Sequence, residues 1–257
     1  MNQIRFEYQE GYSQINPAVL NFDGRKSKAD KIQLVLSDYY QNNPQTGIIL
    51  DIGCSGGIIL HHLNSGFQQK IGIDIDFQAL KKAKNEFHFD DIEFICADGM
   101  NLPFKENALS LIICNHVYEH LPDSGQLFKE IFRTLKSGGA CYCAAGNALG
   151  IMEGHYHLPF LSWLPKDLAH RYLRLMKRGD FYYEKHLNWW SFKKIISMFR
   201  LHDYTIRIIN EPGSFAATGM IKKGSWISRI PRSFLSLLYP FIPTWILVLE
   251  KPGADQN

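Results

Sequence analysis

The chain has 257 residues, of which 46% are apolar and 21% charged, and these values are typical of one globular α/β domain with insertions. A net charge of +3 is too small to indicate a nucleic-acid-binding protein on charge alone. The polar start argues against a signal peptide, and no apolar run approaches the roughly 18 residues of a spanning helix, so we expect a cytoplasmic protein.

The first half of the chain alternates between two periodicities. Residues 27–41 have apolar side chains at helical spacing, which predicts an amphipathic helix. Strands are predicted near residues 47–52, 70–75, 91–97, 109–115 and 139–146, and helices near residues 56–66, 76–87 and 123–136. This alternation indicates a mostly parallel sheet with helices on both faces.

The alternation stops after residue 147. Residues 148–187 are rich in aromatic residues, His and Arg, and they lack a strand–helix pattern. A helix near 190–200 follows, and then strands near 203–210 and 244–251, which a second insertion at 211–243 separates. We expect the last two strands to be neighbours in the same sheet.

The five cysteines give no indication of a metal centre. All of them lie in strand-like or glycine-loop contexts, and no second cysteine pair or spaced histidine pair joins Cys141 and Cys143. We therefore expect buried, reduced thiols and no metal site.

A glycine-rich turn follows the first predicted strand, in "ILDIGCSGGIIL" at residues 48–59. Gly57 precedes two isoleucines, so the Lys and Ser/Thr of a phosphate-binding P-loop are missing. The G-x-G-x-x-G spacing of a dinucleotide site is missing as well. What remains is an acid at the strand end, Asp51, followed by Gly53 and Gly57, and such glycines let a backbone approach a ligand closely.

This turn resembles the first motif of the class I S-adenosylmethionine-dependent methyltransferases, with Ser55 in the place of the middle glycine. Later stretches resemble the family's further motifs in the right order. These stretches are "KIGIDID" at 70–76, "FICADGMNLPF" at 94–104, "LSLIICNHVYEHLPD" at 109–123 and "LFKEIFRTLKSGGACYCAAGN" at 127–147. The fourth motif is similar to that of the branch that includes ubiquinone- and menaquinone-biosynthesis enzymes, although Ser110 stands where the family usually has an Asp.

The resemblance implies a fold, a cofactor and a division of the chain. The expected fold is α/β, a Rossmann-like doubly wound seven-stranded sheet with the last strand antiparallel, plus lid insertions. We interpret residues 1–257 as a single domain. Its parts are an N-terminal helical cap at 1–46, a cofactor-binding core at 47–147, a lid or substrate insertion at 148–187 and, at 188–257, C-terminal strands that include the insertion 211–243.

The implied cofactor is S-adenosylmethionine, and six residues match positions that would hold it: Asp51, Gly53, Gly57, Asp74, Asp98 and Asn115. An acid beside the turn can hold the ammonium of the cofactor's methionine end. Asp74 would accept the ribose hydroxyls and Asp98 would meet the adenine amino group. Each polar residue also has a structural alternative, as a turn acceptor for Asp51 and Asp98, a helix cap for Asp74 and a loop-capping amide for Asn115.

The acceptor must arrive at the same edge of the sheet, and the segment after the fifth strand carries suitable side chains. Glu153, His155, Tyr156 and His157 cluster there. His155 or His157 would serve as a base, with Glu153 orienting it, because His is the usual base near neutral pH. The alternative is an internal network that holds the lid together.

Two further segments suggest a surface for an anionic or lipid-linked acceptor. Residues 165–178 predict a basic helix with an apolar stripe at Leu168, Tyr172, Leu175 and Met176. Residues 226–245 are apolar and aromatic, and they form either core beneath the last strands or an interfacial surface. Together the two segments suggest peripheral contact with the inner face of a membrane.

The sequence therefore predicts a methyltransferase that acts on a small-molecule or lipid-linked acceptor, with a glycolipid as one form of the latter. A dinucleotide-binding oxidoreductase and a non-catalytic S-adenosylmethionine-binding module remain the alternatives. Nucleic acid is not expected as a substrate, because no N/D-P-P-Y/F run and no Pro-Cys nucleophile occur.

Overall fold

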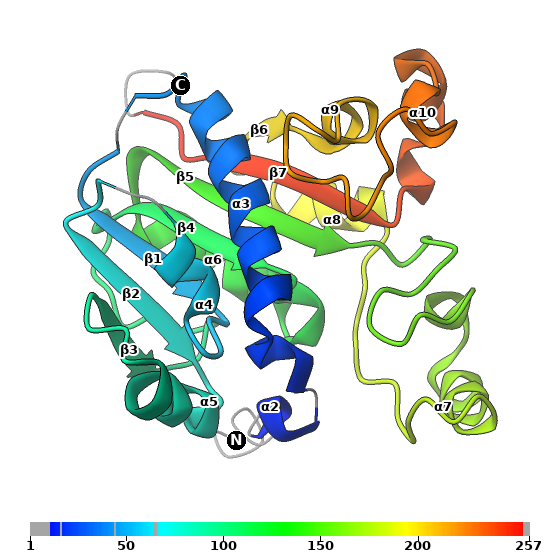
Figure 1. The fold of residues 1–257 in the computed structure, drawn as a ribbon, viewed down its shortest axis with the longest axis horizontal. Coiled ribbons are helices and arrows are strands. Elements are labelled where there is room, and N and C mark those ends of the chain that lie inside the picture. The colour runs from blue at the N-terminus through cyan, green and yellow to red at the C-terminus, as the bar shows by residue number, and fades with distance from the viewer. Residues whose placement is uncertain (1–10, 16, 44, 64–65, 254–257) are drawn as a thin grey trace.

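The computed structural model of the protein describes residues 11–15, 17–43, 45–63 and 66–253 (Figure 1). Its strands are β1 Ile48–Ile52, β2 Gln69–Asp74, β3 Ile92–Cys96, β4 Leu109–Asn115, β5 Leu135–Gly146, β6 Arg200–Asp203 and β7 Thr244–Glu250. Its α-helices are α2 Tyr12–Ile15, α3 Phe22–Tyr39, α4 Ile58–His62, α5 Phe77–Lys82, α6 Ser124–Thr134, α7 Lys166–Leu175, α8 Trp189–Ile195, α9 Thr205–Asn210 and α10 Arg232–Leu237. Shorter helical turns are η1 Pro17–Leu20, η2 Ala83–Phe87, η3 Tyr118–His120, η4 Leu161–Trp163, η5 Ile227–Arg229 and η6 Tyr239–Phe241.

The strands form one seven-stranded sheet in the order β3-β2-β1-β4-β5-β7-β6. Strands β1 to β5 pair in parallel, and β7 lies antiparallel between β5 and β6. The expected fold, with the last strand antiparallel, is confirmed. Because β1 and β4 are neighbours and run the same way, their carboxyl ends and the turns that follow meet at one edge.

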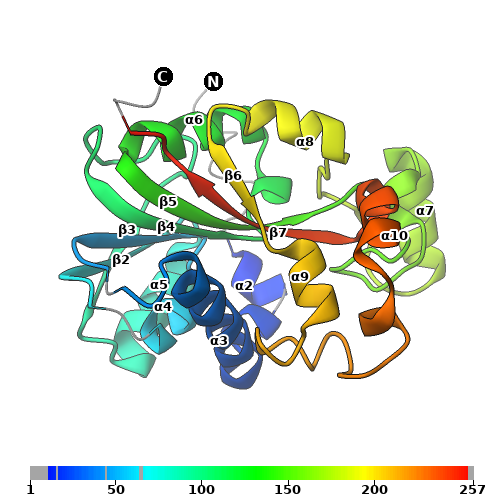
Figure 2. The same cartoon turned by 90° about the horizontal axis from the view of Figure 1, so that it is seen from above.

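Helices cover both faces of this sheet (Figure 2). Helices α6 and α8 lie on one face, where Phe128 and Phe192 pack against buried strand residues. Helices α3 and α4 lie on the other, with Ile32 and Ile58 in the second core cluster. The sheet is therefore buried on both sides, as the apolar strands predict. None of the described helices combines the length and the apolar character that a bilayer crossing demands.

The first half of the chain agrees with the predicted element order, but several boundaries differ: α3 begins at Phe22 and not near 27, and β5 begins at Leu135 and not near 139. Helix α4 is shorter than the predicted 56–66, and residues 64–65 of that prediction lie outside the described residues, as do residues 1–10 of the N-terminal cap. Helix α6 ends at Thr134, two residues before the predicted end at 136. Gly138, with φ of 74°, lies where the pairing with β4 jumps from Leu135 to Ala140.

The prediction of a strand at 203–210 is wrong. The strand that pairs with β7 is β6, at residues 200–203, and residues 205–210 form helix α9. The Asp203 carboxylate accepts a hydrogen bond from the Thr205 amide at 2.8 Å, and this turn ends the strand. A short apolar run such as "IRII" fits either a strand or a buried helix, and here Ile208 packs into the core as part of a helix.

Residues 148–187, which we call the lid, contain a small core of their own. It consists of the buried side chains Leu158, Leu161, Ala169, Leu173 and Tyr182. The predicted apolar stripe of helix 165–178 is wrong, because α7 buries Ala169 and Leu173 while Leu168, Leu175 and Met176 are exposed.

The two ends of the lid are joined at its root. The Tyr118 hydroxyl donates to the Gly146 carbonyl at the end of β5 and accepts a hydrogen bond from the Leu187 amide. Residues Asn147 and Leu187 also form a parallel bridge. The chain thus leaves the sheet and returns to it at almost the same point.

Candidate active site

The turn after β1 has the backbone geometry that its glycines permit. Gly53 and Gly57 both have positive φ, 68° and 71°, which L side chains rarely adopt. A Cβ on Gly53 would lie 2.9 Å from Val117, and a Cβ on Gly57 would lie 2.6 Å from Phe94. Gly53 lines a large cavity at the carboxyl edge of the sheet, whereas Gly57 caps α4 and allows close packing.

Two acids near the carboxyl ends of β1 and β2 lie beside this turn. Asp51 is buried and its Oδ2 has no hydrogen-bond partner. Burial raises the pKa of Asp51 to about 7, a shift that Arg25 opposes and Asp74 reinforces. Asp74 lines the cavity and accepts hydrogen bonds from the amides of Ser55 at 2.7 Å and Asp76 at 2.9 Å, so it also fixes the shape of the turn.

Asn115 and Asp98 occupy different positions relative to the cavity. Asn115, at the end of β4, lines the cavity, and its buried Nδ2 has no partner. Asp98 accepts the Met100 amide at 2.8 Å, and its neighbours Ala97 and Gly99 line the cavity in its place. The structure thus brings Gly53, Asp74 and Asn115 to the cavity wall itself.

The N-terminal helices supply residues that the sequence analysis did not identify. Tyr12 and Ser13 of α2 and Arg25 and Lys28 of α3 line the same cavity. The Ser13 amide donates to Asp76 at 2.8 Å. Burial, together with the neighbouring Arg25, lowers the pKa of Lys28 to about 8. These residues carry no recognisable motif, and only the fold places them over the sheet edge.

The lid contributes its predicted cluster to the other end of the cavity, where His155 and His157 are both lining residues. Glu153 is buried, and its Oε1 lies 2.8 Å from His155 Nδ1. Burial alone would lower the pKa of His155, but the hydrogen bond to Glu153 and nearby carboxylates outweigh it and raise the pKa to about 9. His155 is therefore protonated at neutral pH and would act as a base only after losing that proton.

A second carboxylate–imidazole pair was missed by the sequence analysis. His116 and His120 line the cavity, and His116 Nδ1 lies 3.0 Å from Oε1 of the fully buried Glu119. Burial lowers the pKa of His116 and of His120, which keeps both imidazoles neutral at pH 7. The signal was present in "NHVYEH", where His116 and Glu119 are three residues apart, but it gave no indication that the lid would cover it.

The cofactor end of the cavity fits an amino-acid ligand. Ser55 Oγ and Asn115 Nδ2, on residues that line the cavity, and Asp51 Oδ2, two residues before the lining Gly53, are buried without hydrogen-bond partners. Unpaired buried polar groups are costly, so such groups at a cavity indicate a polar ligand. One carboxylate, one hydroxyl and one amide match the ammonium and carboxylate of a methionine moiety.

Comparison with known proteins decides the family. A family model described as a methyltransferase domain matches residues 50–143, the segment from β1 to β5 that carries the turn, Asp74 and Asn115. This segment is a class I S-adenosylmethionine-dependent methyltransferase domain. The cofactor of this methyltransferase is therefore S-adenosylmethionine.

Its relatives share mainly that segment. A ubiquinone/menaquinone biosynthesis C-methyltransferase from Desulfotalea psychrophila is 29% identical over 39% of this chain and 42% of its own length. A ubiquinone biosynthesis O-methyltransferase from Idiomarina loihiensis is 27% identical over 62% of this chain and 68% of its own. The methyltransferase thus spans less than half the length of the first relative.

One solved structure shows that the fold extends over the whole chain. A possible histamine N-methyltransferase from Thermotoga maritima superposes with a TM-score of 0.55, covering 96% of this chain and 99% of its own. At 11% identity this likeness concerns the fold alone.

Proposed function

We propose that the protein transfers a methyl group from S-adenosylmethionine to a small-molecule or lipid-linked acceptor. The supporting observation is a single cavity of about 550 Å³. Gly53, Asp74 and Asn115 line one part of it, and His116 and His155 line another. A cofactor held by the first group therefore shares its space with an acceptor held beside the histidines.

The chain's contribution to such a reaction is positioning and proton transfer. When bound, S-adenosylmethionine supplies a methyl group on a sulfonium sulfur, and an acceptor lone pair takes the methyl carbon as the C–S bond breaks. Holding the acceptor in line supplies much of the rate. A hydroxyl acceptor also gives up a proton, and the predicted proton acceptors are His157 and the neutral form of His155, which Glu153 holds. His116, held by Glu119, is a further one.

A lipid-linked acceptor is supported by the surface around the lid. On α7, Leu175 is 78% exposed and alternates with exposed basic residues such as Arg171 and Arg174. In the second insertion, Trp226 is 75% and Leu237 is 73% exposed. Figures 1 and 2 place α7 and α10 at the same end of the molecule. Apolar side chains beside cations suit an anionic phospholipid surface, so we place the protein at the inner face of a membrane.

Calorimetry and a labelling assay test the catalytic proposal together. The protein should bind S-adenosylmethionine and not NAD, and it should transfer labelled methyl from S-adenosylmethionine into the metabolite or lipid extract of its source organism. Cofactor binding without any labelled product from either extract would support a non-catalytic module. Binding of NAD in preference to S-adenosylmethionine would support an oxidoreductase.

Vesicle co-sedimentation tests the membrane contact separately. Binding to vesicles with anionic lipid should exceed binding to neutral vesicles and should weaken with salt. Leu175→Ser combined with Leu237→Ser should reduce it. Phe77→Ser is the matched control, because Phe77 is 55% exposed on α5, away from α7 and α10. Equal loss in the control, or no binding by the wild type, would contradict a docking face.

A further inference from the structure

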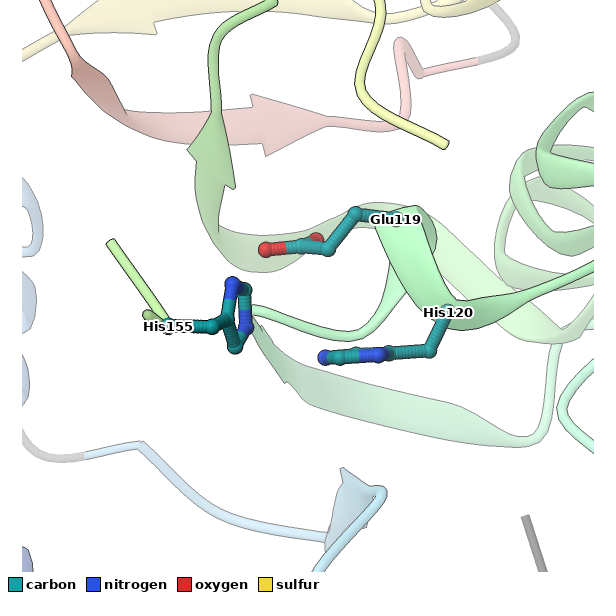
Figure 3. A group of neighbouring side chains, drawn as sticks. All are labelled: Glu119, His120 and His155. Atoms are coloured by element: carbon teal, nitrogen blue, oxygen red, sulfur yellow. The ribbon is translucent and has the colours of Figure 1, made fainter. Parts of the chain in front are cut away.

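A cluster of imidazoles and carboxylates lies where the lid meets the end of β4. Glu119 and His120 come from η3, and His155 comes from the lid. Figure 3 shows these three side chains converging from opposite sides. One potential ligand atom from each lies within 4.8 Å of those of the other two. His120 and His155 also line the cavity, so the cluster faces the acceptor space.

Part of this cluster lacks hydrogen-bond partners. Glu119 is 0% exposed, and its Oε1 faces His116, but its Oε2 has no partner. His120 Nδ1 and Glu184 Oε2 are also buried without partners, and Glu184 Oε1 lies 4.0 Å from that same His120 nitrogen. Buried polar atoms without partners are strongly disfavoured, so two carboxylate oxygens and one imidazole nitrogen left unpaired beside one another indicate a missing cation.

The histidine of the lid is held in the way that metal-binding histidines are held. Its Nδ1 lies 2.8 Å from Glu153 Oε1, so Nε2 of His155 is the nitrogen that can bind an ion, once the ion displaces the proton that this nitrogen carries at neutral pH. Glu153 is itself fixed by the amides of His155 and Tyr156, at 2.8 and 2.7 Å. Metal-ligating imidazoles usually donate their second N–H to a carboxylate or carbonyl, which fixes the ring and its tautomer.

We propose that Glu119, His120 and His155 bind a divalent transition-metal ion at the cavity wall. Two imidazoles and one carboxylate are a ligand set that Zn²⁺ and Fe²⁺ accept, with a coordination position left open. At bond lengths of about 2.1 Å, tetrahedral ligand atoms lie about 3.4 Å apart. The distances between the three ligand atoms, which are at most 4.8 Å, therefore shorten by up to roughly 1.4 Å when the ion binds. Rotation of the side chains can supply this movement.

The open position gives the ion a role, and this part rests on the proposed function. An acceptor hydroxyl bound there has its pKa lowered by the metal, which makes it a better nucleophile at neutral pH. Its proton passes to a neighbouring imidazole such as His116. The inference therefore favours acceptors with an oxygen nucleophile.

Metal binding is tested without an activity assay. Chelator-treated protein is titrated with Zn²⁺ by calorimetry, and with Co²⁺ by visible absorption, which reports imidazole and carboxylate ligation. The wild type should bind one ion per chain. Glu119→Gln and His120→Ala should each weaken binding by more than about 100-fold, and Glu153→Gln by about 10- to 100-fold. His120→Ala keeps the test open if the buried Glu119 variant does not fold.

Two controls show where the ion binds. His202→Ala removes a histidine whose Nε2 lies 2.8 Å from Glu250 on the far strands, and it should leave affinity unchanged. His186→Ala tests the overlapping group of Glu153, His155 and His186, whose ligand atoms also lie within 4.8 Å of one another.

No ion bound by the wild type, unchanged affinity in both ligand variants, or dependence on His186 in place of His120 would each overturn the assignment. Titration with S-adenosylmethionine in excess chelator separates the two proposals. If cofactor binding and methyl transfer persist there, the proposed role of the ion in the reaction fails and the methyltransferase proposal stands, while the titrations alone decide whether the site binds an ion.

Discussion

Cofactor affinity should depend on pH through Asp51. The carboxyl is buried, and its pKa of about 7 means that it holds a proton over much of the mildly acidic range. The cofactor's ammonium requires the carboxylate form. The pKa of Asp51 is raised in the free protein, so the carboxylate that binds the cofactor is lost as the pH falls through 7. Well above pH 7, nearly all of the protein carries this carboxylate.

The size of the effect follows from that value. If the ammonium keeps Asp51 ionised in the complex, the fraction ready to bind falls about 25-fold between pH ~7.5 and ~5.5, or about 1.9 kcal/mol. Below pH 7 each cofactor bound should release close to one proton. The charged groups facing Asp51 are Arg25, which favours the carboxylate, and Asp74, whose own pKa burial also raises.

Calorimetry in buffers of different ionisation enthalpy measures both the affinity and the protons released. Asp51→Asn should bind more weakly at pH ~7.5 and should lose most of the slope, while any remaining slope reports Asp74. A wild-type affinity that is flat across this range, or a slope that Asp51→Asn leaves intact, would refute the assignment of the ammonium to Asp51.

Further variants separate the cofactor end from the acceptor end. Asp74→Ala should lose about 2–3 kcal/mol of S-adenosylmethionine affinity by calorimetry, because a charged acceptor is removed from two hydroxyls and from the Ser55 amide; unchanged affinity would contradict its role at the ribose. His155→Ala should lower kcat about 10²–10⁴-fold with near wild-type cofactor affinity, measured with whichever acceptor the labelling assay finds; a wild-type rate would exclude it from the chemistry. Gly57→Ala should lower thermal stability, because φ is 71° and the new Cβ would lie 2.6 Å from Phe94; an unchanged Tm would show that the turn relaxes freely.

The cofactor half of the site could be predicted because it is local in sequence. Asp51, Gly53 and Asp74 each lie at the carboxyl end of a strand with a clear apolar run, and parallel strands bring these ends together. The strand at 203–210 was misplaced because a four-residue apolar run does not distinguish a strand from a buried helix.

The acceptor half depends on contacts between distant segments. Helix α7 buries small Ala169 against the lid's own core and leaves Leu175 in solvent, so hydrophobicity alone gave the wrong face. Lys28 reaches the cavity only because α3 crosses the sheet edge. Glu119 and His155 are 36 positions apart, and nothing in either local pattern indicates that they meet.

Tyr118 joins the two ends of the lid, and this has a consequence for how the lid unfolds. Residues 147 and 187 are fixed beside each other, so the 39 residues between them form a loop whose two ends are held together. Such a segment can lose its order without unfolding β5 before it or α8 after it. Amide hydrogens within the lid should therefore exchange with solvent as one cooperative group, faster than those of β4 and β5. A ligand bound between Glu119 and His155 would slow that exchange, because it would link the lid to the segment that follows β4.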